Sequence, residues 1–440
     1  MSALLFVLAG AAGAALGRAL LGRWFNHLTL YALVWGGALA LYAAGLIHYY
    51  PITWQAWASI AIAAAELALG AVTVILLARR PREADAALPR PPVVPERTLA
   101  IAILALTACA ALAMGLQWVF LARRFGGIGG ALFQSVNERY QMRVAGETGG
   151  IPYAGALALT AAAFAGIHTA RIRRLDLVGL LPLVVVALQG VTAAGRMGMG
   201  VGGALFVATL ILARRRTGAA TAAPPALRSG PVSRLGPAIG LVVVLAVLIG
   251  GFSFVSGARG LVTDLPGVDP AMARYARYVP FVPSLYGSLS VGPPTFSEYL
   301  KAGAPRVAPG AYSFAPFLRG LRRLGVGPGV PYYEEQYFTP VPSNTGTWLK
   351  NTYAEFGAPG IVALPFLVGA LAAWLMVRTR QGRLSTLVVL AHVLAVVIFS
   401  FSFNIMVLGD WWVSALVGWL LAAALDRRAR AAPGTPAVVA

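Results

Sequence analysis

Basic side chains gather in one polar stretch of this 440-residue chain, between residues 256 and 353. The stretch separates apolar segments and carries nine cations against five anions. The cations are Arg259, Arg274, Arg277, Lys301, Arg306, Arg319, Arg322, Arg323 and Lys350, and the anions are Asp264, Asp269, Glu298, Glu334 and Glu335. Guanidinium groups bind phosphate through paired hydrogen bonds, so this composition predicts binding of an anion that carries phosphate.

The spacing of the arginines predicts local clusters. Arg274 and Arg277 are three residues apart and would share one face of a helix, and Arg319, Arg322 and Arg323 would also cluster. Two more arginines have small neighbours: Arg196 in the sequence TAAGRMG (192–198) and Arg259 in SGARG (256–260). Small neighbours let a ligand approach closely. Each arginine has a second interpretation, as an anchor to lipid headgroups or a solvated charge.

One pair of carboxylates in the stretch suits proton transfer. Glu334 and Glu335 are its only adjacent acids, and Tyr333 and Tyr337 flank them. A like-charged neighbour raises the pKa of a carboxyl, and a base of this kind can deprotonate a sugar hydroxyl. A salt bridge to Arg322 or Arg323 explains the pair equally well.

The chain shows no pattern for a metal or a nucleotide cofactor. Its four histidines are dispersed, Cys109 is the single cysteine, and no P-loop or HExxH sequence is present. We therefore expect no metal and no cofactor.

Composition places the chain among polytopic membrane proteins. Hydrophobic residues make up 58% and charged residues 11%, with a mean hydropathy of +0.74, whereas soluble domains carry about 25% charged residues. The net charge of +20 comes largely from short arginine runs at the ends of apolar segments. Membrane anchoring explains such runs, so we do not expect a nucleic-acid partner.

Apolar runs long enough to cross the membrane predict an all-α fold of about eleven transmembrane helices. They fall at roughly 2–21, 27–47, 55–78, 98–121, 151–170, 176–194, 198–213, 236–255, 357–377, 384–407 and 411–425. The predicted domains are residues 1–255 with helices one to eight, the extracytoplasmic loop 256–353, and residues 354–440 with helices nine to eleven and a cytoplasmic tail.

Arginine runs predict the orientation. They follow the third, fifth, seventh, ninth and eleventh helices, beginning at Arg79, Arg171, Arg214, Arg378 and Arg427. Because cytoplasmic ends carry the excess of Lys and Arg, the N-terminus is expected outside and the C-terminus inside. The loop 256–353 then lies outside, where its positive charge indicates an anionic lipid-linked substrate. Within it, apolar residues recur at helical spacing between Tyr312 and Leu324, which predicts a short amphipathic helix on the membrane surface.

The end of the loop resembles the Wzy-type O-antigen polymerases, which join oligosaccharide repeat units. Their pattern of Asn, Thr, Tyr, an acidic residue, Phe and two glycines is filled here by Asn344, Thr347, Tyr353, Glu355, Phe356, Gly357 and Gly360. Arg196 and the stretch from Tyr275 to Leu300 are also similar to parts of that family. The related O-antigen ligases usually carry a histidine sequence in this loop, and residues 256–353 contain no histidine.

The resemblance implies a glycosyltransferase of the bacterial cytoplasmic membrane. It would transfer a glycan from undecaprenyl pyrophosphate to the next lipid-linked unit, alongside a flippase and a chain-length regulator. Arg196 and Arg259, with Arg274 or Arg277, would bind pyrophosphate, and Arg319, Arg322 and Arg323 would add to the substrate site. Glu335 or Glu334 would be the base. Asn344, Thr347 and Tyr353 would hydrogen-bond sugar.

Three alternatives remain at this point. An O-antigen ligase shares the layout, a flippase or other transporter would also present cations, and a membrane scaffold would explain a structured loop. A transporter would place several cations within its helices, whereas the middle parts of the apolar runs lack Arg and Lys. A scaffold leaves the positive charge of the loop unexplained.

Overall fold

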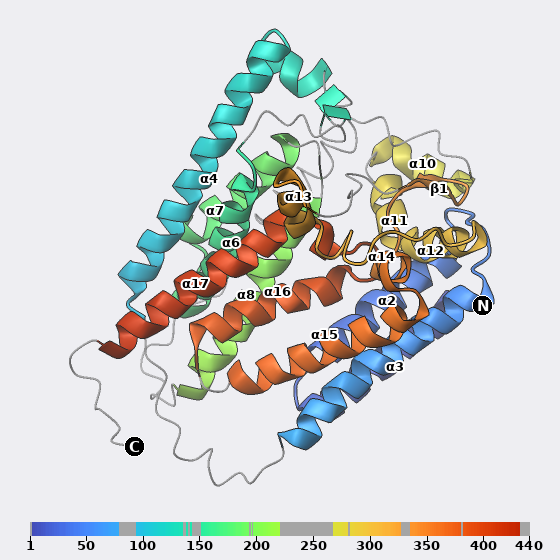
Figure 1. The fold of residues 1–440 in the computed structure, drawn as a ribbon, viewed down its shortest axis with the longest axis horizontal. Helices are drawn as coiled ribbons and strands as arrows, with labels where there is room; N and C mark the ends of the chain where they lie inside the picture. Colours follow the sequence, from blue (N-terminus) through green and yellow to red (C-terminus); the bar gives the residue numbers. More distant parts are fainter. Residues whose placement is uncertain are drawn as a thin grey trace. The chain divides into compact units, whose positions relative to one another are not determined.

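The computed structural model describes an all-α protein over residues 2–78, 94–134, 138–139, 141–142, 151–192, 195, 197–220, 267–279, 282–326, 335–379 and 382–431 (Figure 1). In these ranges, the strands are β1 (Tyr337–Phe338) and β2 (Pro342–Ser343), which pair as an antiparallel hairpin. The chain forms two compact units, and each unit draws on separate stretches of sequence.

The first unit comprises residues 1–80, 260–374 and 393–409. It contains three long helices: α1 (Ala3–Leu21), α2 (His27–Ala44) and α3 (Trp54–Leu77). It also holds the short helices α10 (Pro270–Tyr278), α11 (Val282–Ser290), α12 (Gly292–Lys301), α13 (Ala315–Arg323) and α14 (Trp348–Phe356). Most of α15 (Ala358–Arg378), the end of α16 (Leu384–Phe399) and the 3-10 turn η4 (Ile405–Val407) complete it.

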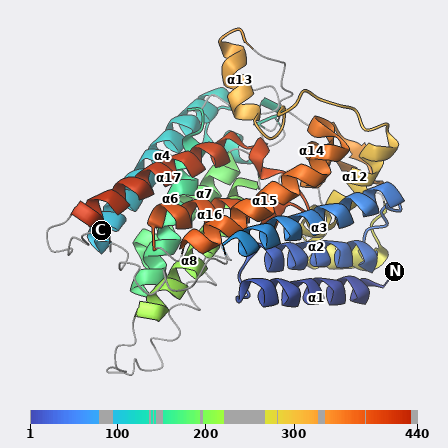
Figure 2. The same cartoon turned by 60° about the horizontal axis from the view of Figure 1, so that its bottom comes forward.

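Small residues bring α1 and α2 into close contact. α2 lies between α1 and α3 (Figure 2). A Cβ added to Gly36 would lie 2.8 Å from the Cα of Gly10, so glycine is required where these backbones meet. Asn26 accepts a hydrogen bond from the Thr29 amide at 2.9 Å and caps α2, while the Thr29 hydroxyl donates to the Ala14 carbonyl at 3.1 Å. These contacts fix the first helical pair.

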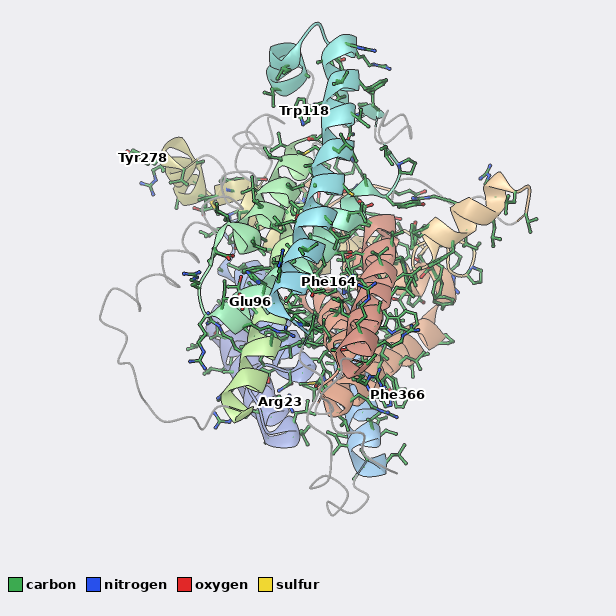
Figure 3. All side chains as sticks on the ribbon, turned by 90° about the vertical axis from the view of Figure 1, so that its left-hand side faces the viewer. Arg23, Glu96, Trp118, Phe164, Tyr278 and Phe366 are labelled. Atoms are coloured by element: carbon green, nitrogen blue, oxygen red, sulfur yellow. The ribbon has the colours of Figure 1, made fainter. Side chains whose placement is uncertain are left out.

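The second unit comprises residues 81–259, 375–392 and 410–440. Its described elements are α4 (Glu96–Arg124), the π-helix η2 (Gly130–Gln134), α6 (Ala154–Ile172), α7 (Leu177–Thr192), α8 (Met197–Ala220), the remainder of α15 and α16, and α17 (Gly409–Ala431). α6 is its central helix and packs against α4, α7 and α8. Phe164, on α6, is fully buried (Figure 3). Ala and Gly dominate α6, which allows neighbouring helices to approach on all sides.

Helices of membrane-spanning length confirm the membrane-protein class. Among the residues described, seven helices are long and apolar enough to cross a bilayer: α1, α2, α3, α4, α6, the Met197–Arg214 part of α8, and α15. α7 and α16 are apolar but shorter. The predicted helix at 236–255 lies outside the described residues, so the total of eleven and the orientation stay predictions.

The predicted short helices of the loop are present, as α10 to α14 show. α13 confirms the helix expected between Tyr312 and Leu324. Leu321 within α13 and Leu324 immediately after it are exposed, and so is the cation Arg322. An exposed apolar face beside basic residues is typical of interfacial helices. Tyr278, which ends α10, also projects outward (Figure 3).

Candidate functional site

Backbone pairing holds the loop on the connection between α2 and α3. The His48 amide donates to the Gly267 carbonyl at 2.7 Å, and the Asp269 amide donates to the Leu46 carbonyl at 3.0 Å. The Tyr50 amide donates to the carbonyl of Thr339, in the β1–β2 turn, at 2.9 Å. The loop is therefore attached at its described start and again at its hairpin.

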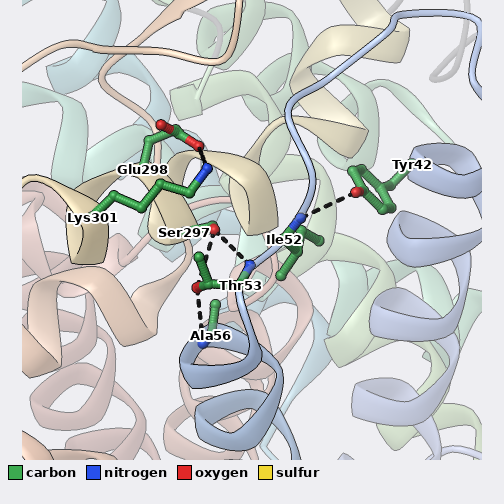
Figure 4. Close-up of polar contacts among 7 residues, drawn as sticks. All are labelled: Tyr42, Ile52, Thr53, Ala56, Ser297, Glu298 and Lys301. Atoms are coloured by element: carbon green, nitrogen blue, oxygen red, sulfur yellow. Dashed lines mark hydrogen bonds and ion pairs between the residues drawn. The ribbon is translucent and has the colours of Figure 1, made fainter.

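Side chains attach α12 to the start of α3 (Figure 4). The Ser297 hydroxyl accepts from the Thr53 amide at 2.9 Å and donates to the Thr53 hydroxyl at 3.2 Å. Thr53 is the N-cap of α3, so the same residue begins the helix and holds α12. On the next turn of α12, Lys301 pairs with Glu298 at 2.6 Å.

Glu355 holds the segment before α13 against α14. Its carboxylate is 2% exposed and accepts from the backbone amides of Tyr312 and Ser313 at 2.6 and 2.7 Å. The Ser313 hydroxyl donates to its second oxygen at 2.7 Å. A buried carboxylate needs such donors, because an unsatisfied buried charge is costly. The acidic residue of the polymerase-like pattern thus has a structural task.

Three tyrosines form the centre of the candidate site. Tyr299, on α12, lies edge-on to Tyr337 of β1 at 5.8 Å and to Tyr353 of α14 at 6.3 Å between ring centroids. Its hydroxyl donates to the Pro305 carbonyl at 3.0 Å. Burial raises the pKa of Tyr299 to about 12, with Arg306 opposing the rise and Glu335 adding to it. Both charges therefore act on the same hydroxyl.

Two cations border the tyrosines. The exposed Arg306 guanidinium lies 5.8 Å from the centroid of the Tyr353 ring. Gly357 follows α14 with φ +69°, a left-handed conformation that favours glycine, and the Arg306 guanidinium lies against it. The Lys350 ammonium lies 5.1 Å from the centroid of the Tyr337 ring and donates to the Asn344 carbonyl at 3.3 Å. Cations over aromatic rings are stabilised by the ring quadrupole.

A carboxylate completes the set. Glu335 is exposed, and its Oε2 accepts from the Tyr337 hydroxyl at 3.1 Å. Sugar recognition uses aromatic faces with hydrogen-bonding groups, phosphate recognition uses cations, and proton removal uses a carboxylate. Arg306, Lys350, Glu335 and the tyrosines together offer all three.

Two buried polar side chains at α14 have no hydrogen-bond partner among the described residues. The side chain of Asn351 is fully buried, and neither its amide oxygen nor its nitrogen has a hydrogen-bond partner in the described part of the chain. The hydroxyl of Thr347, which precedes α14, is also buried and also has no hydrogen-bond partner among the described residues. Buried polar groups of this kind are rare and call for an explanation such as a ligand or water.

The structure brings four predicted residues to α14 and its approach: Glu335, Asn344, Thr347 and Tyr353. The other predicted site cations whose side chains are described lie on different helices. Arg274 is exposed on α10, Arg319 is half-buried on α13, and Arg322 is exposed on α13. Arg277 and Arg323 belong to the same two helices, but their side chains lie outside the description. Arg196, Arg259 and Glu334 lie outside the described residues.

Sequence reasoning did not select Lys350, Arg306, Tyr299 or Tyr337 as site residues. Lys350 had a signal, because it lies between Thr347 and Tyr353 in the polymerase-like pattern. The other three come from separate parts of the loop, and only folding brings them together. Within the described ranges, no three His, Cys, Asp or Glu side chains are placed to hold a metal ion.

In the second unit, a buried arginine holds the end of the helix that precedes Arg196. Arg139 donates through Nη1 to the carbonyls of Val191 and Thr192 at 3.0 and 3.2 Å. Its guanidinium lies 5.8 Å from the centroid of the Trp118 ring. Burial lowers the pKa of Arg139. The C-terminus of α7 is thus held by a cation, where the helix dipole favours positive charge.

Comparisons of the chain with protein-family models, with characterised proteins and with solved structures give no match. The polymerase-like pattern and the geometry of the site therefore carry the functional argument alone.

Proposed function

We propose that this protein polymerises undecaprenyl-pyrophosphate-linked oligosaccharide repeat units into a surface polysaccharide. In this proposal it lies in a bacterial cytoplasmic membrane, with the loop and the N-terminus outside. The observation that carries the proposal is the cluster of Arg306, Lys350 and Glu335 around three tyrosines, inside a loop whose end has the polymerase-like pattern.

The proposed reaction is a glycosyl transfer. An acceptor hydroxyl oxygen attacks the anomeric carbon of the donor and forms the new glycosidic bond. The bond from that carbon to the pyrophosphate oxygen breaks, and undecaprenyl pyrophosphate leaves with the electron pair. Glu335 accepts the proton of the hydroxyl. Arg306 and Lys350 stabilise the negative charge that grows on the leaving group, with Arg196 and Arg259 as further proposed phosphate ligands.

The residues of α14 take the binding role. Tyr353 is half-buried and would offer its hydroxyl to a sugar, and Asn351 is a buried amide that no described residue satisfies. Asn344 lies half-buried at the end of the hairpin. Together they would orient the acceptor, and such positioning supplies a large part of enzymatic rate enhancement.

The decisive experiment gives purified protein in nanodiscs lipid-linked repeat units from its host cell. A ladder of polymers, with release of undecaprenyl pyrophosphate, supports the proposal. Transfer onto a lipid A core without polymerisation indicates a ligase. Movement of the lipid-linked unit between leaflets without new glycosidic bonds indicates a transporter. Glu335→Gln protein is the matched control, since it keeps the fold and loses the proposed base.

A further inference from the structure

A groove at one end of α1, α2 and α3 has no part in the site described so far. It encloses about 410 Å³, within the range of roughly 300–1,000 Å³ typical of ligand sites. Its walls include Phe6 in the first turn of α1, Tyr42 in the last turn of α2 and Trp57 in the first turn of α3. His48, Tyr49 and Ile52 of the α2–α3 connection close it.

Aromatic rings dominate the walls and are paired. Phe6 stacks on Trp57 with centroids 5.7 Å apart and an interplanar angle of 6°. Tyr42 stacks on Tyr49 at 6.2 Å and 20°. Trp57, Tyr42 and Tyr49 are half-buried, so part of each ring remains accessible, and tyrosine adds a polar end to an apolar body. The groove is therefore amphipathic, with both surfaces that a pyranose needs.

Polar groups in the groove favour a sugar over a hydrocarbon chain. The Tyr42 hydroxyl accepts from the Ile52 amide at 3.3 Å (Figure 4), and its own hydrogen has no acceptor among the described residues. The His48 side chain is 65% exposed and lies 3.8 Å from Asp269. The Tyr49 hydroxyl pairs with Ser290 at 2.8 Å. An isoprenoid chain could form no hydrogen bond with the Tyr42 hydroxyl or the His48 side chain, whereas a sugar could.

The position of the groove connects it with the candidate site. Its wall residue His48 pairs with the start of the loop, and Tyr50, two residues on, pairs with Thr339 of the hairpin. That hairpin begins at Tyr337, which binds Glu335. When one sugar of a glycan reacts beside Glu335, its further sugars would extend along the segment where the loop is attached to the α2–α3 connection.

We infer that this groove binds a non-reacting sugar of the lipid-linked oligosaccharide. The inference rests on the proposed function and adds a subsite to it. Non-reacting parts of a substrate supply binding energy that positions the reacting atoms. Loss of the groove should therefore weaken glycan binding while the charged cluster around Tyr299 stays intact.

The test measures binding of the free oligosaccharide, released from the lipid-linked repeat unit by mild acid, to the whole protein in nanodiscs. Calorimetry would compare Trp57→Leu and Tyr42→Phe proteins with the parent. We expect about tenfold weaker binding for Trp57→Leu, equal to about 1.4 kcal/mol, because the indole ring in the wall of the groove is lost. Tyr42→Phe should weaken binding about threefold. Trp54→Leu is the control, because Trp54 is on the same helix but 74% exposed and outside the groove.

Several outcomes overturn the inference. The inference fails if the parent protein binds no oligosaccharide, or if both groove variants bind it as tightly as the parent does. Weaker binding of undecaprenyl phosphate without loss of sugar binding would make the groove a lipid site. Where Trp57→Leu fails to fold, Tyr42→Phe decides, as it keeps size and ring. Sugar binding in the groove without polymer formation would refute the proposed reaction but support the groove as a sugar site. Polymer formation with equal sugar binding by the groove variants and the parent would support the reaction and refute the sugar site.

Discussion

Lys350 is a cation that the fold has almost removed from solvent, with 2% of its surface exposed. Its ammonium faces the Tyr337 ring and the Asn344 carbonyl, so it is held close to the proposed base. A flexible surface lysine would not hold one position in this way. In the proposed reaction, a charge held in this way would stabilise the leaving pyrophosphate without reorganisation.

We expect Lys350→Met to lower polymer turnover by about a hundredfold, the scale seen when one charge-stabilising donor is removed. Met keeps the length of the side chain and removes the charge. Single-turnover assays with purified protein would measure the effect. Lys301→Met is the control, because Lys301 belongs to the same loop and pairs with Glu298. Equal rates for both variants would show that the Lys350 charge has no part in transfer.

Glu335 is the one of the two predicted bases that the structure describes, and its carboxylate accepts a hydrogen bond from the Tyr337 hydroxyl. Glu335→Gln should slow turnover by about a hundredfold or more, while substrate binding changes much less. Rates across pH for Glu334→Gln and Glu335→Gln would assign the role. If both variants keep the parental rate and pH profile, neither residue is the base.

The raised pKa of Tyr299 predicts that the protein loses stability at alkaline pH. Burial raises its pKa to about 12, above its ordinary value, so the folded protein holds the phenolic proton more tightly than the unfolded chain does. Its contribution to stability is complete below about pH 10 and is lost as the pH rises towards 12. Thermal unfolding temperatures should fall over this window, and by less in Tyr299→Phe. An identical fall in both proteins would exclude Tyr299 as a cause.

At the scale of elements, α14 organises the loop. Its nine residues carry Lys350, Asn351, Tyr353 and Glu355, which face different neighbours. Glu355 reaches the backbone before α13, and Tyr353 reaches Tyr299 of α12. One short helix thus positions two separate segments of the loop.

Glu355→Gln should loosen the segment that leads into α13. Hydrogen bonds to charged groups are stronger than neutral ones by roughly 1 kcal/mol each, so loss of the charge should cost about 2 kcal/mol at the two backbone amides. Hydrogen exchange at the amides of Tyr312 and Ser313 should then be about thirtyfold faster. Amides within α6, in the other unit, serve as the internal reference. Unchanged protection at Ser313 would mean that Glu355 does not hold this segment.

At the scale of the whole molecule, orientation rests on the arginine runs at helix ends. Cysteine labelling with an impermeant reagent tests it in a Cys109→Ser background. Ala302, exposed after α12, and Arg428, exposed on α17, are suitable positions for the new cysteines. Gly310 is less suitable, because it is buried and has φ +79°.

We expect Ala302→Cys to label in intact spheroplasts and Arg428→Cys to label only after permeabilisation. The positive-inside distribution predicts both results. The opposite pattern would reverse the orientation and place the loop in the cytoplasm. Labelling of both without permeabilisation would indicate leaky membranes, which a cytoplasmic marker enzyme detects.

The sequence alone determined the helical class and the boundaries of several long helices, although the predicted run 384–407 extends beyond α16, which ends at Phe399. Runs such as 55–78 and 357–377 agree with α3 and α15 within a few residues, because the hydrocarbon core demands a fixed length of apolar helix. Helical spacing also determined α13, whose apolar and basic residues alternate with a period that one short helix satisfies.

Only the tertiary structure decided the composition of the candidate site. Tyr299, Arg306, Tyr337 and Lys350 are separated by up to 51 positions, and no local pattern relates them. Glu355 has the same acidic side chain as Glu335, yet one is buried under backbone amides and the other is exposed. The cost of an unpaired buried charge is set by neighbours in space, which the order of residues along the chain does not specify.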